Sequence, residues 1–180
     1  MTVERESKSW TWVNERPCEE CGFDASAVPL HDVSSVLRRA TDDWVEVLGG
    51  PDVEVLLRRP SETVWSPTEY GCHVRDVLDL LAYRFERTVS EDRPRFPDWH
   101  PNDRAEQGRY VEERDPCSVA GAIAGRSERV VAMIESMSDS DWQRRGVRAD
   151  GLEFTNAWLS TYLTHDVVHH LHDVRRILGR

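Results

Sequence analysis

The sequence predicts an all-α protein built as a four-helix bundle, and three observations lead to this class. Apolar residues recur every three or four positions in four separate segments, as they do on the buried face of an amphipathic helix. These segments, of about 17 to 25 residues each, are joined by connections of mixed length, which is typical of a bundle. With 180 residues, the chain is long enough for one domain with a full core and too short to expect two.

The first predicted helix runs from about Asp32 to Leu48 and is followed by two glycines, which end it. Its apolar side consists of Val33, Val36, Leu37, Ala40, Trp44, Val45 and Leu48. The second predicted helix begins at Ser66-Pro67-Thr68-Glu69, which combines a capping box with a proline at the first helical position. One side of this helix carries His73, Val77, Leu80, Leu81, Arg84 and Thr88.

The third predicted helix begins at Asp115-Pro116, again a capping residue followed by proline. Residues 139–154 form a connection, in which a turn at Asp150-Gly151 would allow a short hairpin. The fourth helix is predicted from about Thr155 to Leu178. Its apolar stripe consists of Val167, Leu171, Val174 and Leu178.

Two segments lie outside the four predicted helices. Residues 1–31 are expected to form an irregular N-terminal segment packed on the domain, and residues 32–180 to form the bundle as a single domain. Residues 91–114 are rich in Pro, Asp, Arg and Glu and predict a long loop between the second and third helices, carrying Trp99 and Tyr110. Loops of this length are uncommon unless they are functional or mobile.

The acidic composition argues against nucleic acid as a partner. The formal net charge is −10, and the paired arginines sit among acids, so no basic face is available for a phosphate backbone. No apolar run approaches the roughly 20 residues that span a bilayer, and the polar N-terminus has no signal-peptide core. We therefore expect a cytoplasmic protein with a small-molecule substrate and no nucleic-acid or membrane partner. The four cysteines fit a reducing compartment.

Four of the seven histidines lie in HDVVHHLHD, from His165 to Asp173, near the end of the last predicted helix. Residues i and i+4 share a helix face, so His165 and His169 can bind one divalent metal ion. His73 of the second helix is the candidate third ligand. Three imidazoles suit zinc or nickel and leave a coordination position open for a substrate.

Other interpretations of the histidines stand beside this one. An HxxxH pattern also occurs on solvated helix surfaces. On a helical wheel, the stripe from Val167 to Val174 lies roughly opposite His165 and His169, which disfavours a core-facing position unless the helix is buried on two sides. The rival pair, Asp166 with His170, lies nearer the apolar stripe.

Cys18 and Cys21 form a single Cys-x-x-Cys motif near the N-terminus. This motif can be half of a zinc site or a redox pair, and it can equally be two ordinary thiols. Without a second cysteine pair or a thioredoxin-like context, it is a weak signal. Cys72 adjoins His73, but neighbours on a helix diverge by about 100°, so Cys72 is expected to be a packing residue.

The segment WSPTEYGCHVRDVL, from Trp65 to Leu78, followed much later by HDVVHH, resembles the DinB superfamily. The turn DGLEFT at residues 150–155 extends the likeness, which covers most of residues 32–178. The group includes DinB-like metal-dependent proteins and the metal-binding domain of mycothiol-dependent maleylpyruvate isomerases. The resemblance implies a four-helix bundle, often a homodimer, with zinc or nickel on His73, His165 and His169.

The same resemblance implies chemistry on a small thiol such as mycothiol, because a bound metal lowers the pKa of a thiol. The implied function is an S-transferase, or a related isomerase or hydrolase, acting on a small electrophile. A non-catalytic metal- or ligand-binding stress-related protein is the alternative. Candidate catalytic or imidazole-orienting residues are Asp166, Asp173 and Tyr162, and Arg84 is the candidate for binding the carboxylate of a thiol cofactor.

Overall fold

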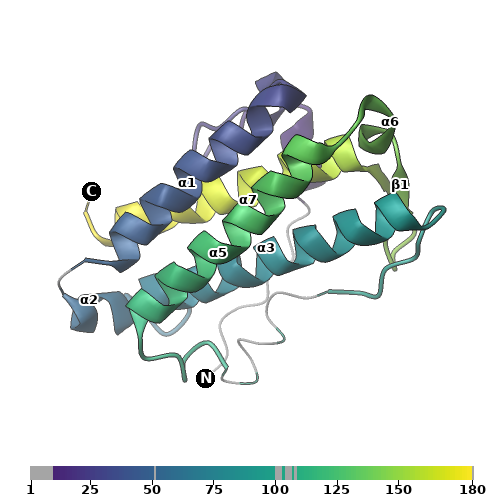
Figure 1. Ribbon diagram of the computed structural model, residues 1–180. Helices are drawn as coiled ribbons and strands as arrows, with labels where there is room; N and C mark the ends of the chain where they lie inside the picture. The colour runs from purple at the N-terminus through teal and green to yellow at the C-terminus, as the bar shows by residue number, and fades with distance from the viewer. Residues whose placement is uncertain (1–9, 51, 100–102, 104–106, 108, 180) are drawn as a thin grey trace.

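The computed structural model describes residues 10–50, 52–99, 103, 107 and 109–179. Four long helices pack side by side in it, which confirms the predicted all-α four-helix bundle (Figure 1). They are α1 (Val33–Leu48), α3 (Pro67–Ser90), α5 (Pro116–Ser136) and α7 (Asn156–Ile177). The shorter elements are η1 (Thr11–Asn14), η2 (Ala25–Ala27), η3 (Leu30–Asp32), α2 (Val53–Leu57), α6 (Asp139–Trp142), β1 (Arg145–Val147) and β2 (Glu153–Thr155). The short helices were not predicted, because segments of this length show no helical periodicity.

The starts of the long helices follow the capping residues that the sequence supplies. The Ser66 side chain accepts a hydrogen bond from the Glu69 amide, and Glu69 in turn accepts one from the Ser66 amide at 2.9 Å, which forms the predicted capping box. Asp115 caps α5 by accepting from the Ser118 amide at 3.1 Å. Thr155 caps α7 in the same way. These caps place His73 in the second turn of α3.

The hydrophobic core lies between the four long helices and fixes the rotation of α7. Val167, Leu171 and Val174 are all buried in it, as the apolar stripe predicted. Trp44 of α1 is completely buried, and its indole Nε1 donates a hydrogen bond to the Val167 carbonyl at 3.0 Å. The stripe therefore faces α1, and the remaining faces of α7 are left for other parts of the chain.

The expected hairpin lies between α6 and α7. Strands β1 and β2 pair antiparallel, with Gly146 opposite Phe154, and Gly151 makes the turn with a φ of 87°. A Cβ atom at Gly146 would come within 2.6 Å of the Phe96 ring and 2.7 Å of the Phe154 ring, so only glycine fits there. The hairpin closes one end of the bundle and leads directly into α7.

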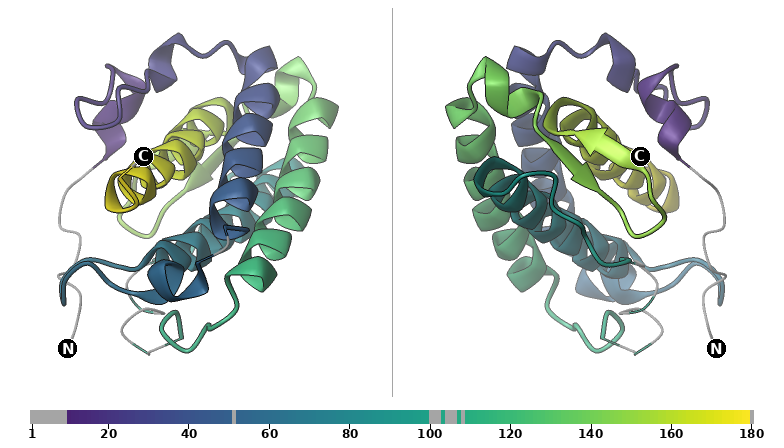
Figure 2. Two further views of the ribbon diagram at one scale, coloured as in Figure 1. Left: turned by 90° about the vertical axis from the view of Figure 1, so that its left-hand side faces the viewer. Right: turned by 90° about the vertical axis from the view of Figure 1, so that its right-hand side faces the viewer.

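The described part of the N-terminal segment lies along α7, where η1 and η2 contact that helix (Figure 2). Val13 and Ala25 of this segment are buried, and the Asn14 side chain donates to the Trp158 carbonyl at 2.8 Å. Residues 1–9 of the expected segment, and residues 100–102, 104–106 and 108 of the expected loop, lie outside the described residues. None of the helices in the described part of the chain has the length and apolarity to span a bilayer.

Candidate functional site

A cavity of about 460 Å³ opens beside α3 and α7 and gathers the predicted site residues. Its walls come from α3, α7, the N-terminal segment, the connections before and after α3, and the connection that follows β1. The residues predicted as metal ligands, catalytic groups or cofactor-binding groups all line it: His73, Arg84, Tyr162, His165, Asp166, His169 and Asp173. Three residues that the sequence interpretation left aside also line it, namely Trp10, Glu20 and Arg148.

The potential metal ligands around this cavity fall into two clusters. We call His73, Asp166 and His170 the cavity cluster, and Cys18, Cys21, His165 and His169 the cysteine cluster. In each, the ligand atoms all lie within 4.8 Å of one another. The three histidines predicted to share one ion are thus split, with His73 in one cluster and His165 and His169 in the other.

The split follows from the pitch of α7. Successive residues on an α-helix are rotated by about 100°, so the pair 165/169 and the pair 166/170 point in different directions. With the Val167 stripe held against α1, the 166/170 pair faces His73 on α3. The 165/169 pair faces the N-terminal segment, which buries it, so α7 is covered on more than one side.

The cavity cluster is held by short polar contacts between α3 and α7. His73 Nε2 lies 3.1 Å from Asp166 Oδ2, and His170 Nε2 lies 3.8 Å from Asp166 Oδ1. The rings of His73 and His170 meet edge to face, with centroids 4.8 Å apart. Asp173 accepts a hydrogen bond from His170 Nδ1 at 3.2 Å. Asp173 thereby fixes the orientation of a ring that the sequence interpretation had named only as a rival.

The charges around Asp166 keep its carboxylate ionised. Burial alone would raise the pKa of Asp166, but the neighbouring His73 and His170, together with the hydrogen bond from His73, hold it well below its usual range. Burial alone would raise the pKa of Asp173 too, but the hydrogen bond from His170 and the charges of the neighbouring histidines together lower it. Both groups are therefore anionic at neutral pH, the state in which a carboxylate binds a metal or orients an imidazole.

Cationic and phenolic groups line another part of the cavity wall. Arg84 is 6% exposed, and its Nε atom has no hydrogen-bond partner among the described residues. Burial, followed by the charge of Arg148, lowers the pKa of Arg84 to about 10, so the guanidinium stays charged at neutral pH. Burial and the charge of Asp166 raise the pKa of Tyr162, so its hydroxyl keeps its proton. These groups suit a ligand that carries an anionic oxygen.

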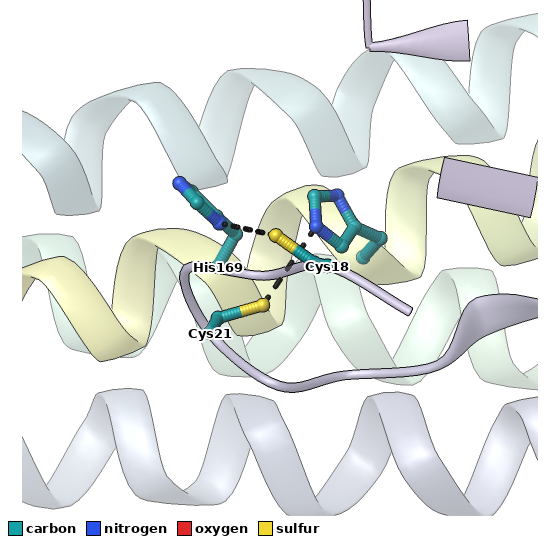
Figure 3. Close-up of side chains that lie close together, drawn as sticks. Cys18, Cys21 and His169 are labelled. Carbon is teal, nitrogen blue, oxygen red and sulfur yellow. Dashed lines mark hydrogen bonds between the residues drawn. The ribbon is translucent and has the colours of Figure 1, made fainter. Parts of the chain in front are cut away.

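The cysteine cluster joins the N-terminal segment to α7. Cys18 Sγ lies 3.6 Å from His169 Nδ1, and Cys21 Sγ lies 3.7 Å from His165 Nε2. Figure 3 shows both cysteines on one loop that crosses α7 beside His169. Burial, followed by the charge of His169, lowers the pKa of His165 to about 4, and burial raises the pKa of the Cys21 thiol to about 11. In the protein without metal, these groups are neutral at pH 7.

Comparison with known proteins gives a family and a fold. The family model described as the DinB superfamily matches residues 36–174. One similar solved structure is YfiT from Bacillus subtilis, described as a probable metal-dependent hydrolase with an unusual four-helix bundle topology. Its TM-score is 0.72 at 16% sequence identity, and the alignment covers 83% of this chain and 87% of YfiT. A mycothiol-dependent maleylpyruvate isomerase has a TM-score of 0.65 at 14% identity, over 83% of this chain and 62% of that one. No curated protein sequence matches the chain.

Proposed function

Because the chain belongs to the DinB superfamily, we propose that the cavity beside α3 and α7 is the active site of a divalent-metal-dependent enzyme. One observation carries the proposal: the ligand atoms of His73, Asp166 and His170 converge within 4.8 Å of one another on the cavity wall. A cleft with convergent polar groups is the arrangement expected of an enzyme. A non-catalytic binding protein would need no open cavity next to its metal ligands.

The residues of the cavity cluster fit a divalent ion. Two imidazoles and one carboxylate are a recurrent catalytic ligand set for zinc and for iron, and they leave coordination positions open. The Asp166 carboxylate is ionised, and His73 Nδ1 is buried with no hydrogen-bond partner among the described residues. A divalent ion held there supplies Lewis acidity, which lowers the pKa of a thiol that coordinates to it. Zinc and nickel remain the metals we propose.

Two further residues of the cavity wall support a proposal for the class of substrate. Arg84 presents a buried charge to the cavity and can bind a carboxylate of the ligand in bidentate fashion. Tyr162 keeps its proton and can donate a hydrogen bond, and Asp173 orients His170. We therefore propose a small acidic thiol of the mycothiol type as the co-substrate. In the reaction, the thiolate sulfur bonds to a small electrophile, so that the whole thiol is transferred; the alternative is a related isomerisation or hydrolysis.

Untagged His170→Ala protein tests the metal site, with His172→Ala as the matched control. His172 lies on the same helix but belongs to neither cluster. After loading with zinc and desalting, elemental mass spectrometry should find about one zinc per chain less in His170→Ala than in the control. Small acidic thiols should raise the melting temperature of metal-loaded His172→Ala, because a ligand stabilises the state that it binds. They should not raise that of His170→Ala.

Equal zinc content in the two variants would show that the cavity cluster holds no metal and would overturn the proposal. If His170→Ala loses zinc but thiols raise the melting temperature of neither variant, the cavity cluster is a metal centre and the proposed thiol chemistry is rejected. In that case the non-catalytic alternative would gain support.

A further inference from the structure

The cysteine cluster has the composition and the sequence spacing of a structural zinc site. Cys18 and Cys21 are separated by two residues, and His165 and His169 by three. Structural Cys₂His₂ sites use this pairing, C-x₂-C with H-x₃-H. We propose that these four residues bind a zinc ion that fastens the N-terminal segment to α7. This site is separate from the cavity cluster and does not depend on the proposed function.

The distances between the sulfur and nitrogen atoms match tetrahedral zinc. With Zn–S near 2.3 Å and Zn–N near 2.0–2.1 Å, two ligands at the tetrahedral angle lie about 3.5–3.6 Å apart. The observed separations are 3.6 Å between Cys18 Sγ and His169 Nδ1, and 3.7 Å between Cys21 Sγ and His165 Nε2. Two sulfur and two nitrogen ligands favour zinc over the harder cations. All four ligand atoms lie within 4.8 Å of one another.

The loop that carries the cysteines is shaped to present both sulfurs together. The Cys18 amide donates to the Phe23 carbonyl at 2.9 Å, and the Gly22 amide donates to the Cys18 carbonyl at 2.8 Å. Gly22 has a φ of 74°, in the left-handed region that favours glycine. A glycine directly after the second cysteine therefore closes the turn. The result is a loop that folds back on itself and brings both sulfurs to α7.

The surroundings of His169 complete the site. If Nδ1 coordinates the ion, Nε2 is left to face carboxylates, and it lies 3.6 Å from Asp173 and 3.7 Å from Glu20. Metal-bound imidazoles commonly direct their second nitrogen to a carboxylate in this way. Trp10 covers the rings of both histidines, with centroids 5.7 Å from His165 and 4.8 Å from His169. With four protein ligands, a tetrahedral ion here has no open coordination position, as in structural zinc sites.

Two free thiols packed by chance do not account for this arrangement. Each sulfur is directed at a different imidazole nitrogen, and the partners are 144 and 151 residues apart in the chain. Cys18 is only 1% exposed, so it is not placed as a reactive surface thiol. Neither cysteine lines the cavity, whereas Trp10 and Glu20 of the same segment do. The zinc ion would therefore hold one wall of the cavity in place without taking part in its chemistry.

Cobalt substitution tests the site directly in the full-length, untagged protein. Co²⁺ bound by thiolates gives sulfur-to-metal charge-transfer bands in the near ultraviolet, which a site of imidazoles and a carboxylate does not give. Wild type and Cys117→Ser, an exposed cysteine outside both clusters, should show these charge-transfer bands. In Cys21→Ser the charge-transfer intensity should fall and cobalt should bind about 10-fold more weakly or worse, since even a lost outer partner costs about 10-fold.

His170→Ala separates this inference from the proposed function. Its cobalt spectrum should keep the thiolate bands of wild type, because only the cavity cluster is changed. Absence of thiolate bands in wild type, or the same bands in Cys21→Ser, would overturn the zinc site. A Cys18–Cys21 disulfide in protein purified under reducing conditions would overturn it as well.

A measurement on wild type covers the case in which Cys21→Ser does not fold. Titrating the thiols of zinc-loaded protein with a mercurial reagent should release zinc in step with the modification of Cys18 and Cys21, located by mass spectrometry. Zinc release that does not follow those two thiols would contradict the assignment.

Discussion

Two ligand clusters share helix α7, yet they sit in different environments. The cavity cluster takes Asp166 and His170 and pairs them with His73 from the neighbouring helix α3. The cysteine cluster takes His165 and His169, each one residue earlier, and pairs them with two cysteines of the N-terminal segment. The first offers imidazole and carboxylate ligands beside a cavity, and the second offers thiol and imidazole ligands under a covering segment. A shift of one residue along a helix is enough to separate an open site from a closed one.

The difference has a chemical consequence. Three protein ligands beside a cavity leave room for a substrate on the metal, whereas four protein ligands leave none. The same helix can therefore carry a metal centre suited to catalysis and one suited to holding the fold together. Removing a ligand or the ion from one centre should therefore have a different effect from removing it from the other.

Removing the zinc of the cysteine cluster should have the largest effect, and it should be local. In metal-free protein, amide hydrogen exchange in residues 10–28 should accelerate by about 100-fold or more. The reason is that zinc, at a free concentration about 100 times its dissociation constant, stabilises the segment it binds by about 3 kcal/mol. Exchange in the middle of α5 should stay slow. Hydrogen-exchange mass spectrometry of chelated and zinc-loaded wild type measures both, with zinc-loaded Cys21→Ser expected to resemble the chelated protein. Unchanged exchange in the N-terminal segment would break the contrast between the two clusters.

Two carboxylates act on metal binding at the cavity cluster, Asp166 as a ligand and Asp173 through His170. Asp166→Asn should weaken metal binding there by about 100-fold or more, because the amide offers no charge to the ion. Asp173→Asn should weaken it by about 10-fold, because it removes the bond that orients His170. Calorimetric titration of protein whose cysteine cluster is already filled measures these affinities. The reverse order of the two variants would mean that Asp173, not Asp166, is the ligand.

The smallest effect concerns the start of α3, which positions His73. Glu69 is buried and bonded to both Arg59 and the Ser66 amide. Burial alone would raise its pKa, but these bonds hold it below the usual value. Glu69→Gln should therefore cost about 1–3 kcal/mol of unfolding free energy at pH 7. The exposed Glu128→Gln on α5 should cost almost nothing.

The same residue gives a pH dependence of defined sign. A carboxyl group whose pKa is lowered by folding adds stability above its unfolded pKa, near 4.3 to 4.5, and that stability is lost as the pH falls through the lower, folded value. The difference between wild type and Glu69→Gln should be constant above about pH 5.5 and shrink below about pH 4.5. Urea unfolding at several pH values measures it. A difference that does not change with pH would show that Glu69 acts through its shape and not through its charge.

Much of the fold could be predicted because its signals are local. The capping box at Ser66, the Asp115-Pro116 start and the turn at Gly151 each act over a few residues, so the chain needs no distant partner to show them. The apolar stripe of α7 likewise indicates which side enters the core. The short helices η1 and η2 were missed, because they depend on packing against α7.

The candidate site was predictable only in part. The sequence pointed to His73 and to the histidine-rich end of α7, and His73, His165, His169 and His170 line one cavity. It did not show that His165 and His169 would meet cysteines, because the Cys-x-x-Cys and His-x-x-x-His motifs lie far apart in the chain and each is weak by itself. Taken together, the two spacings were the signal that could have revealed the cysteine cluster.

The helices, their starts and the one-residue offset between the two ligand pairs on α7 can be read from the sequence, since they depend on local hydrogen bonding and helical pitch. Which pair meets which partner follows from the packing of the whole chain. That choice depends on the rotation of α7 about its own axis, which is fixed by packing against Trp44 of α1, and on the path of the N-terminal segment across the helix. Both arise from contacts between residues more than a hundred positions apart in the chain, and no local pattern contains them.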